Sequence, residues 1–398
     1  MAEVCDFVKK SIVESVGGVK RMTNVLLIYE SFIPSVRLCG FEQLTYLQDQ
    51  GRLVFDLAEA EKVTDQQCQR ADVVWFVRNS TWLSWQIAKQ CKKMGKLLVY
   101  VLDDDVFQIA PTSQSADYFS QKSVRKRVRW FLEECDIFLS PSRYLLEKYK
   151  NKKRRFARIE EPCLEWKEPK KKKGTDKLII GFAGSVDRSS DVAILLEDAL
   201  ETFLKRHGDR VEIQFMGARI DLVDRYGLTY YPYEDNYEAY QKTFHSLEWD
   251  IGLAPMPDSE FHRGKHYNKY IEYAACGCVG IYSNVIPYTY AVEHQVNGLL
   301  VENTKEAWLD ALEWCLENSN KLVDMKQKIS IEAVEKYGIQ PVSEQLMEVI
   351  PELGTFETSH EGNIQIGCYR KMSRIVRYIE FVERNITKPK NILNRLRR

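Results

Sequence analysis

The sequence predicts an α/β protein that contains two parallel sheets in tandem, each covered by helices on both faces. Short apolar runs rich in Val, Ile, Leu and aromatic residues recur without polar alternation, as in strands buried on both faces. Amphipathic helical stretches separate these runs. A lysine-rich segment, 148–177, interrupts the series and divides the 398-residue chain into two alternating halves.

The first half contains five expected strands with helical stretches between them. The helix at 41–51 should stop at Gly51, and the helix at 81–95 should begin near Thr81 and end before Gly95. This alternation of strands and helices is typical of a parallel sheet. The expected strands are 24–31, 52–57, 72–80, 96–105 and 136–142.

The second half repeats the pattern. Strand 177–185 leads to a helix at 191–208 that has Asp191 at its start and Gly208 as its stop. Two Rossmann-like halves of this kind place a ligand beyond the carboxyl ends of the strands, in the cleft between the halves. The remaining expected strands are 211–217, 250–256, 279–284 and 298–303.

We expect four segments along the chain. These are an N-terminal Rossmann-like domain at 1–150, a basic linker at 151–176, a C-terminal Rossmann-like domain at 177–345 and a helical extension at 346–398.

The composition excludes several classes of function. The chain carries 57 Lys and Arg and 57 Asp and Glu, so no global charge favours nucleic acid as a partner. Its ten cysteines are scattered and form no CxxC pair, which argues against a structural zinc site and favours a reducing cytoplasm. No apolar run approaches the roughly 18 residues of a spanning helix.

Two strand-to-helix turns of the second half have features of phosphate sites. The loop after the first strand contains Gly184 and Ser185, small residues that let a ligand approach the backbone just before a helix start. The turn at 283–298, which contains Pro287 and Tyr288, offers similar backbone N–H groups. Many ordinary turns share these features.

A third loop, 254–277, brings the cations Arg263, Lys265 and Lys269 just ahead of Glu272. If the segment is helical from about residue 265, the two lysines and the glutamate share one face. A cationic face suits a diphosphate, and a carboxylate can accept two hydrogen bonds from the vicinal hydroxyls of a ribose. An ordinary i,i+3 surface pair explains the same spacing equally well.

The first half should supply the other wall of the cleft. All six histidines lie beyond the linker, so carboxylates must serve if a base from this half is needed. Asp103, Asp104 and Asp105 end an expected strand and are the candidate catalytic residues. A divalent metal site and a helix-capping role are the alternatives, and the two-domain architecture does not require a metal. Arg37 is either an anion contact across the cleft or a surface residue.

Segment 250–303 resembles the nucleotide-binding half of GT-B glycosyltransferases, particularly the large retaining family called GT4. The resemblance extends over 177–340 and is looser over 24–150, where it points to a polysaccharide-type subgroup. The family motif K-x-x-E-A-x-A-x-G-x-P-V-V, followed by a turn and G-x-L-V, is matched here by Lys269, Glu272, Ala275, Gly277 and Val279, then by Gly298, Leu300 and Val301.

The resemblance implies a GT-B fold whose domains face a cleft, with the acceptor in the first domain and a nucleotide sugar in the second. It implies that Glu272 holds the donor ribose and that Lys265 or Lys269 holds the diphosphate. The expected activity is retaining hexosyl transfer from a UDP-, GDP- or dTDP-linked sugar to a polysaccharide or glycolipid, in cell-surface glycan synthesis, without a cofactor. Transition-state charge on the diphosphate would be stabilised by lysines and helix N-termini.

One position departs from the family. A second glutamate usually lies eight residues before the ribose-binding one, and Gly264 occupies that position here. Two other functions therefore stay open: a sugar-nucleotide epimerase or hydrolase of the same fold, and an inactive glycosyltransferase-like scaffold.

The C-terminal segment 369–398 is strongly basic and has an apolar stripe at helical spacing: Met372, Ile375, Ile379, Val382 and Ile386. A helix docked on the first domain or on a partner is one interpretation. Peripheral contact with the inner face of a membrane is another. Nucleic-acid binding is not expected, because the segment has no aromatic stacking platform.

Overall fold

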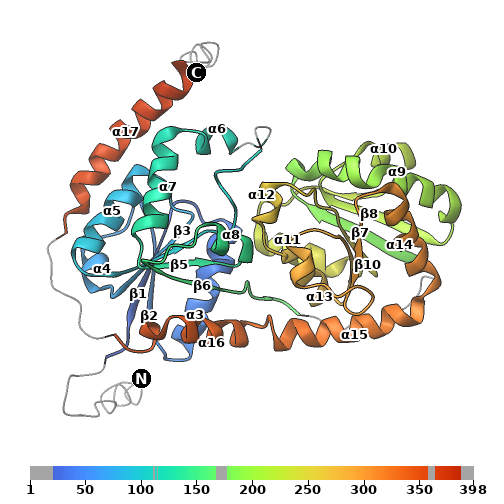
Figure 1. Cartoon of the computed structure of the whole chain (residues 1–398), viewed down its shortest axis with the longest axis horizontal. Helices are drawn as coiled ribbons and strands as arrows, with labels where there is room; N and C mark the ends of the chain where they lie inside the picture. Colours follow the sequence, from blue (N-terminus) through green and yellow to red (C-terminus); the bar gives the residue numbers. More distant parts are fainter. Residues whose placement is uncertain (1–20, 111–112, 114, 167–176, 357–363, 387–398) are drawn as a thin grey trace.

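The computed structural model describes residues 21–110, 113, 115–166, 177–356 and 364–386, and it contains two six-stranded parallel sheets with flanking helices (Figure 1). The predicted fold class is confirmed. Each sheet lies between helical layers, and buried apolar side chains fill both faces of the first sheet and a continuous core around the second.

The first sheet has the strand order β2-β1-β3-β4-β5-β6. Its first five strands match the runs expected from the sequence to within a few residues. The sixth, β6, lies within the segment treated as a linker, because the run RFAR is short and basic. The strands are β1 Asn24–Tyr29, β2 Val54–Glu59, β3 Val73–Val77, β4 Leu97–Val101, β5 Ile137–Ser140 and β6 Arg155–Arg158.

The second sheet has the order β12-β11-β10-β7-β8-β9. Strand β9 has no counterpart in the sequence analysis, since its three residues are polar or only half-buried. The strands are β7 Leu178–Gly184, β8 Val211–Gly217, β9 Thr229–Tyr231, β10 Ile251–Ala254, β11 Val279–Ser283 and β12 Leu299–Val301.

The helices of the first domain begin and end where the sequence provides caps. The Thr81 side chain accepts a hydrogen bond from the Ser84 N–H at the start of α5, and Gly95 adopts a φ of 71° just after its end. The helices are α2 Pro34–Val36, a π-helical turn Arg37–Phe41, α3 Glu42–Asp49, α4 Asp65–Arg70, α5 Trp82–Lys93, α6 Ala116–Phe119, α7 Lys122–Glu134 and α8 Arg143–Lys148.

The long helix α9 of the second domain starts at Ser189, so Asp191 lies in its first turn and is not the cap that the sequence indicated. The helices are α9 Ser189–His207, α10 Asp221–Tyr226, α11 Tyr237–Ser246, α12 Glu260–Arg263, α13 Asn268–Ala275, α14 Lys305–Glu317 and α15 Ser319–Glu335, with 3₁₀ turns at Val186–Arg188 and Tyr288–Tyr290.

The chain passes between the domains twice. After β6 it runs along the second domain, where the Cys163 N–H donates to the Tyr337 carbonyl at 2.6 Å. After α15 it returns as α16 (Ile339–Val349), which packs against α3 below the first sheet (Figure 1). Leu346 and Leu353 join the apolar core there. The last ten residues of the predicted linker, 167–176, lie outside the described residues.

The last helix, α17 (Ile366–Ile386), docks on the first domain by a mixed face that includes Ile366, Tyr369, Ser373 and Glu380 (Figure 1). Arg127 of α7 and Glu380 of α17 form a buried ion pair at 2.7 Å, and Gln90 donates to the Tyr369 hydroxyl at 2.8 Å. Three residues of the apolar stripe face away from the domain: the exposed fractions of Met372, Ile375 and Ile379 are 51%, 62% and 48%. Among the residues that the structure describes, no helix has both the length and the apolar character needed to span a bilayer.

Candidate functional site

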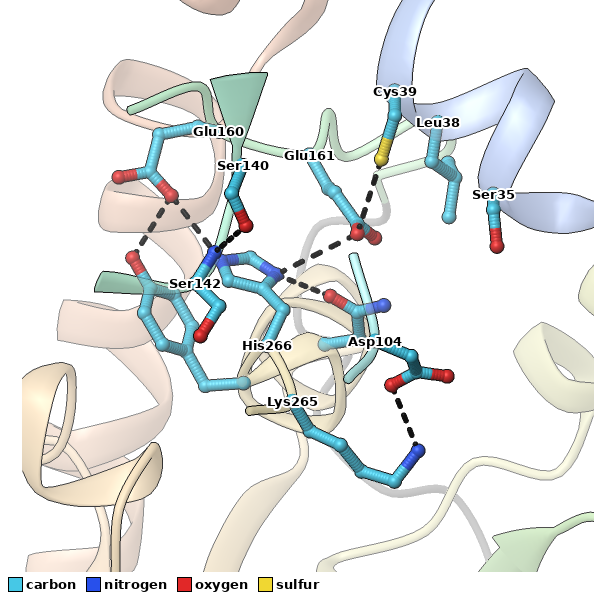
Figure 2. Close-up of polar contacts among 12 residues, drawn as sticks. Ser35, Leu38, Cys39, Asp104, Ser140, Ser142, Glu160, Glu161, Lys265 and His266 are labelled. Atoms are coloured by element: carbon cyan, nitrogen blue, oxygen red, sulfur yellow. Dashed lines mark hydrogen bonds and ion pairs between the residues drawn. The ribbon is translucent and has the colours of Figure 1, made fainter. Parts of the chain in front are cut away.

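Side chains from both domains meet where the carboxyl ends of the two sheets approach each other (Figure 2). The first domain contributes Asp104, which follows β4, and Glu160 and Glu161, which follow β6. The second domain contributes Lys265 and His266 from the connection between α12 and α13. We call these five residues the interlobe junction.

The Lys265 ammonium group donates to Asp104 Oδ1 at 3.0 Å across the two domains. Arg78, just after β3, lies on the other side, with its Nη1 3.5 Å from Asp104 Oδ2. Burial favours the neutral acid, but Lys265 and Arg78 outweigh it and lower the pKa of Asp104, so this carboxylate is charged. Arg78 has a φ of 57°, a conformation that non-glycine residues rarely adopt and that often occurs at functional sites.

His266 of the second domain is buried against two glutamates of the first (Figure 2). Its Nε2 lies 3.4 Å from Glu160 Oε2, and its Nδ1 lies 4.0 Å from Glu161 Oε1. Burial lowers the pKa of His266, yet the two glutamates outweigh burial and raise it overall. The pKa of Glu160 is lowered in turn, because His266 and Arg158 outweigh its burial. The junction therefore contains a charged His266–Glu160 pair.

Glu161 behaves differently from Glu160. Burial raises the pKa of Glu161 to about 7, although the nearby His266 opposes this shift. The Cys39 thiol donates to Oε1 at 3.5 Å, while Oε2 is buried without a hydrogen-bond partner. Donor atoms of Cys39, Asp103 and Glu161 lie within 4.8 Å of one another, a spacing that would also suit a metal ion. Arg78 Nε, 3.5 Å from Asp103, already supplies positive charge at this point.

The three consecutive aspartates have different surroundings. Asp103 and Asp104 face Arg78 at the interlobe space. Asp105 is buried and accepts hydrogen bonds from the Tyr149 hydroxyl at 2.7 Å and from the Phe107 N–H at 3.1 Å. Asp105 therefore holds its own loop in place, whereas its two neighbours pair with cations at the interlobe space.

Helix α13 begins at Asn268, three residues later than the interpretation of a shared face required. Lys265 therefore precedes the helix and turns toward Asp104, while Lys269 and Glu272 pair with each other on α13. The Tyr240 hydroxyl lies 3.1 Å from Lys269 Nζ and 3.3 Å from Glu272 Oε2. The expectation of one face for both lysines was wrong, because the backbone leaves the helix between α12 and α13.

The pair on α13 still lies between the domains. Glu272 and Tyr240 of the second domain line a cavity of about 30 Å³ together with Leu38 and Glu161 of the first. Arg263 lies elsewhere: it forms two hydrogen bonds to Asp258 at 2.7 and 2.8 Å, and its side chain is 44% exposed. Lys269 and Glu272 therefore do form an i,i+3 ion pair, and Glu272 faces the interlobe space.

The loops after β7 and β11 approach this pair. Burial raises the pKa of Tyr288 to about 12, and the opposing charges that act on it belong to Arg188 and Lys269. Arg188 also acts on Asp104, so it lies within electrostatic range of both walls. Of the remaining residues predicted here, Gly184 is half-buried, Ser185 is exposed and Pro287 is buried.

Gly264 packs directly against the first domain. A Cβ atom at this position would lie 3.1 Å from Asp105 Cβ and 3.2 Å from Leu145 Cδ2. Both distances are shorter than ordinary contacts between carbon atoms, so the first domain fills the space that a larger side chain would need. This packing explains why a glycine stands where the resembling family has a glutamate.

Two more ion pairs cross between the domains. Arg37 Nη1 lies 3.0 Å from the carboxylate of Glu238, and Lys148 pairs with Glu260. The anion that Arg37 meets across the cleft is thus a side chain of the second domain. Together with the interlobe junction, these contacts hold the two domains against each other.

The sequence analysis did not select Arg78, Glu160, Glu161, Arg188 or His266. Arg78 follows an expected strand, and the rule that ligands bind at carboxyl ends of parallel strands would have selected it. The two glutamates were missed because β6 was not expected. His266 is adjacent to Lys265, but nothing in the sequence indicates which domain its ring contacts.

No protein-family model matches the chain, and no curated protein matches it in sequence. Several solved structures match it in fold. HepE from Anabaena, in complex with UDP and glucose, superposes with a TM-score of 0.59 at 12% identity, over 83% of this chain and all of that one. A glycosyltransferase from Rickettsia africae superposes with a TM-score of 0.59 at 13% identity, over 84% and 99%.

Sucrose-phosphate synthase from Thermosynechococcus elongatus matches with a TM-score of 0.57 at 12% identity, over 83% of this chain and 99% of that one. At such low identities the similarity establishes the GT-B arrangement of two Rossmann-like domains and nothing finer.

Proposed function

We propose that this chain is a GT-B glycosyltransferase that transfers a sugar from a UDP-, GDP- or dTDP-linked donor to a glycan or lipid-linked acceptor. We further propose a retaining, GT4-like hexosyltransferase of polysaccharide or glycolipid synthesis. The observation that carries the proposal is the meeting of cations from the second domain with carboxylates from the first, at the carboxyl ends of both sheets.

The second domain provides the groups that a nucleoside diphosphate needs. Lys265, Lys269 and Arg188 hold the diphosphate and stabilise the negative charge that develops on it as the bond to the anomeric carbon breaks. Glu272 accepts hydrogen bonds from the ribose hydroxyls. The solved structures of HepE with UDP and with UDP-glucose support a donor of this class for the shared fold.

The first domain provides the acceptor wall. Asp103 and Asp104 accept hydrogen bonds from the acceptor hydroxyl, whose oxygen forms the new bond to the anomeric carbon while its proton passes to one of these carboxylates. Asp105 is a positioning residue, because its contacts with Tyr149 and Phe107 fix the loop that carries the other two. No metal ion enters this scheme, since lysines supply the positive charge.

Incubation with a panel of nucleotide sugars and candidate acceptors tests the proposal. Nucleotide release that depends on an acceptor supports transfer. Acceptor-independent conversion would instead identify an epimerase or hydrolase, and the absence of nucleotide binding would identify a scaffold.

The site itself is tested by Glu272→Gln. This change should weaken donor binding about tenfold, because one charged hydrogen-bond acceptor for the ribose is lost. Glu147→Gln changes an exposed glutamate that forms another i,i+3 pair, with Lys150, and should leave donor binding unchanged. Equal donor affinity of Glu272→Gln and wild type, measured by calorimetry, would remove Glu272 from the site.

We also propose that the enzyme works at the cytoplasmic face of a membrane through residues 369–398. This segment contains ten Lys and Arg against two Glu in a chain of zero net charge. In α17 the docked face leaves Met372, Ile375 and Ile379 exposed beside Lys371 and Arg374. An apolar strip flanked by cations suits an anionic lipid surface.

Sedimentation with phosphatidylglycerol-containing vesicles tests the membrane proposal. Ile375→Glu with Ile379→Glu should abolish sedimentation of the full chain. A matched control, Val323→Glu with Ile331→Glu, changes two apolar residues of α15 that are 60% and 56% exposed, and it should sediment like wild type. If wild type stays in solution, or if both double variants sediment equally, the segment does not bind membranes.

A further inference from the structure

The first domain carries a basic hollow away from the interlobe junction. It has a volume of about 690 Å³ and lies between α7 and the turn that follows α8. We define it by Phe107, Arg125, Arg129, Lys152 and Lys153, all of which line it. A volume of this size is typical of ligand sites.

The hollow lacks compensating acids. Of its lining residues only Glu133 is acidic, against Arg125, Arg129, Lys150, Lys152 and Lys153. Arg125, Arg129, Lys152 and Lys153 form no ion pair with a carboxylate in the described part of the chain, whereas the neighbouring Lys92, Lys150 and Arg155 do. Bringing five cations together around a single acid, Glu133, costs free energy, which a bound anion would offset.

Both arginines are held in position. The Arg125 and Arg129 guanidinium groups lie over the Phe107 ring, with their central carbons 5.2 and 5.4 Å from its centroid. Arg125 also donates to the Phe107 carbonyl at 3.3 Å. These contacts orient planar donor groups toward a ligand in advance and reduce the entropy lost on binding.

The basic surface continues beyond this hollow. A second hollow of about 470 Å³ shares Lys152 and Lys153 with the first and adds three cations, Lys92, Arg154 and Arg155, and one acid, Asp136, to the lining. Two adjoining basic hollows form an extended surface, which suits a chain-like anion better than a single phosphate group.

The basic hollow is connected to the proposed acceptor wall. Phe107, whose ring contacts Arg125 and Arg129, belongs to the same loop as Asp104 and Asp105. Tyr149 lines the hollow and donates to Asp105 at 2.7 Å. A polymer bound in the hollow would therefore lie beside the loop that presents Asp103 and Asp104 to the acceptor.

We infer that the basic hollow binds an acidic oligosaccharide, the anionic part of the acceptor, through its carboxylate or sulfate groups. The inference deepens the proposed function and rests on it for the role of acceptor. A nucleic acid fits less well, since the Phe107 ring is covered by guanidinium groups and is not available to stack a base.

Binding of a heparin hexasaccharide to the full-length chain tests this inference without a donor. Wild type should bind it more tightly than a neutral oligosaccharide of equal length, and more weakly as salt rises. Arg125→Glu with Arg129→Glu should reduce the affinity at least about tenfold, and Lys152→Glu with Lys153→Glu should do the same from the opposite side of the hollow.

A matched control, Lys321→Glu with Lys328→Glu, changes two exposed lysines of α15 and should bind the hexasaccharide like wild type. Unchanged affinity in both hollow variants would overturn the inference, as would equally tight binding of a single-stranded oligonucleotide of the same charge. Nucleoside diphosphate binding should be unchanged in the hollow variants. Loss of hexasaccharide binding with intact nucleotide binding supports the inference, and a failure of nucleotide binding in wild type counts against the proposed function alone.

Discussion

The two domains bring opposite charges to the space between them. The strand ends of the first sheet contribute mainly carboxylates: Asp103, Asp104, Glu160 and Glu161. Those of the second contribute Arg188, Lys265, His266 and Lys269. In the structure without a ligand, Lys265 pairs with Asp104 and Lys269 pairs with Glu272. Each lysine that we assign to the diphosphate is thus already neutralised by an acid.

Under the proposed function, a donor competes with side chains of the protein. A diphosphate bound to Lys265 would take the place of Asp104 and release this carboxylate toward the acceptor side. His266 and Glu160, which are buried, hold the domains together by a contact that no ligand needs to replace. The charge pairs between the domains are therefore of two kinds. The Lys265–Asp104 pair is the exchangeable part, which a ligand could replace, and the His266–Glu160 pair is the structural part.

The largest expected effect comes from removing the buried cation of the structural part. His266→Ala removes the buried cation that Glu160 and Glu161 share and leaves Glu160 with Arg158 alone, which should lower the free energy of unfolding by about 3 kcal/mol. Denaturant unfolding checks this value. His207→Ala removes a half-buried histidine that pairs with Glu313 at 3.6 Å on the surface, and it should cost less than about 1 kcal/mol. Equal losses of unfolding free energy in the two variants would show that His266 contributes no more to stability than a surface histidine does.

The exchangeable part should respond to Lys265→Met. Losing one charged hydrogen bond to a diphosphate should weaken nucleoside diphosphate binding by about tenfold to about a hundredfold. Arg263→Met, two residues earlier, removes a cation that pairs with Asp258 outside the site, and it should leave the affinity unchanged. Calorimetric titration checks both variants. A larger loss in Arg263→Met would reverse our assignment of the two cations.

The pH dependence separates Glu161 from its neighbours. Its pKa is raised to about 7, so the folded chain binds this proton more tightly than the unfolded chain does. Stability must then fall as pH rises through the folded pKa, by about 2 kcal/mol between pH ~5.5 and ~7.5. The raised pKa of His266 acts in the same direction at and above its unfolded value.

Glu161→Gln keeps a neutral side chain and should lose the Glu161 contribution. Unfolding free energies of wild type and variant, measured across this pH window, give the difference. Parallel pH profiles would mean that Glu161 is already charged at low pH in the folded protein.

The smallest effect should come from Asp104→Asn. Without its competing carboxylate, Lys265 is free for the ligand, so nucleoside diphosphate affinity should rise about fivefold, the equivalent of one partly exposed ion pair. Calorimetry on Asp104→Asn, on Lys265→Met and on the double variant measures the coupling between the two residues in nucleoside diphosphate binding. Weaker binding in Asp104→Asn would show that Asp104 supports the donor site and does not compete with it.

Local sequence patterns were sufficient for the sheets and for single helices. Buried runs such as 24–31 and 211–217 became strands because they can be stable only between two helical layers. Helix α5 begins after Thr81 and ends before Gly95, as predicted, because capping depends only on backbone groups that are near in the sequence. Strand β6 was not predicted, because its polar sequence gives no strand signal and the strand is stabilised by pairing with β5.

The sequence by itself determined the two-domain α/β fold, the carboxyl edges where a ligand would bind, and the i,i+3 pairing of Lys269 with Glu272. Only the tertiary structure decided that Lys265 turns to Asp104, that Asp105 turns inward to Tyr149, and that His266 meets Glu160 and Glu161. The physical reason is range. Strand and helix signals act between near neighbours in the chain, whereas the charge pairs of the junction join residues more than 100 positions apart, which only the packing of the two domains brings together.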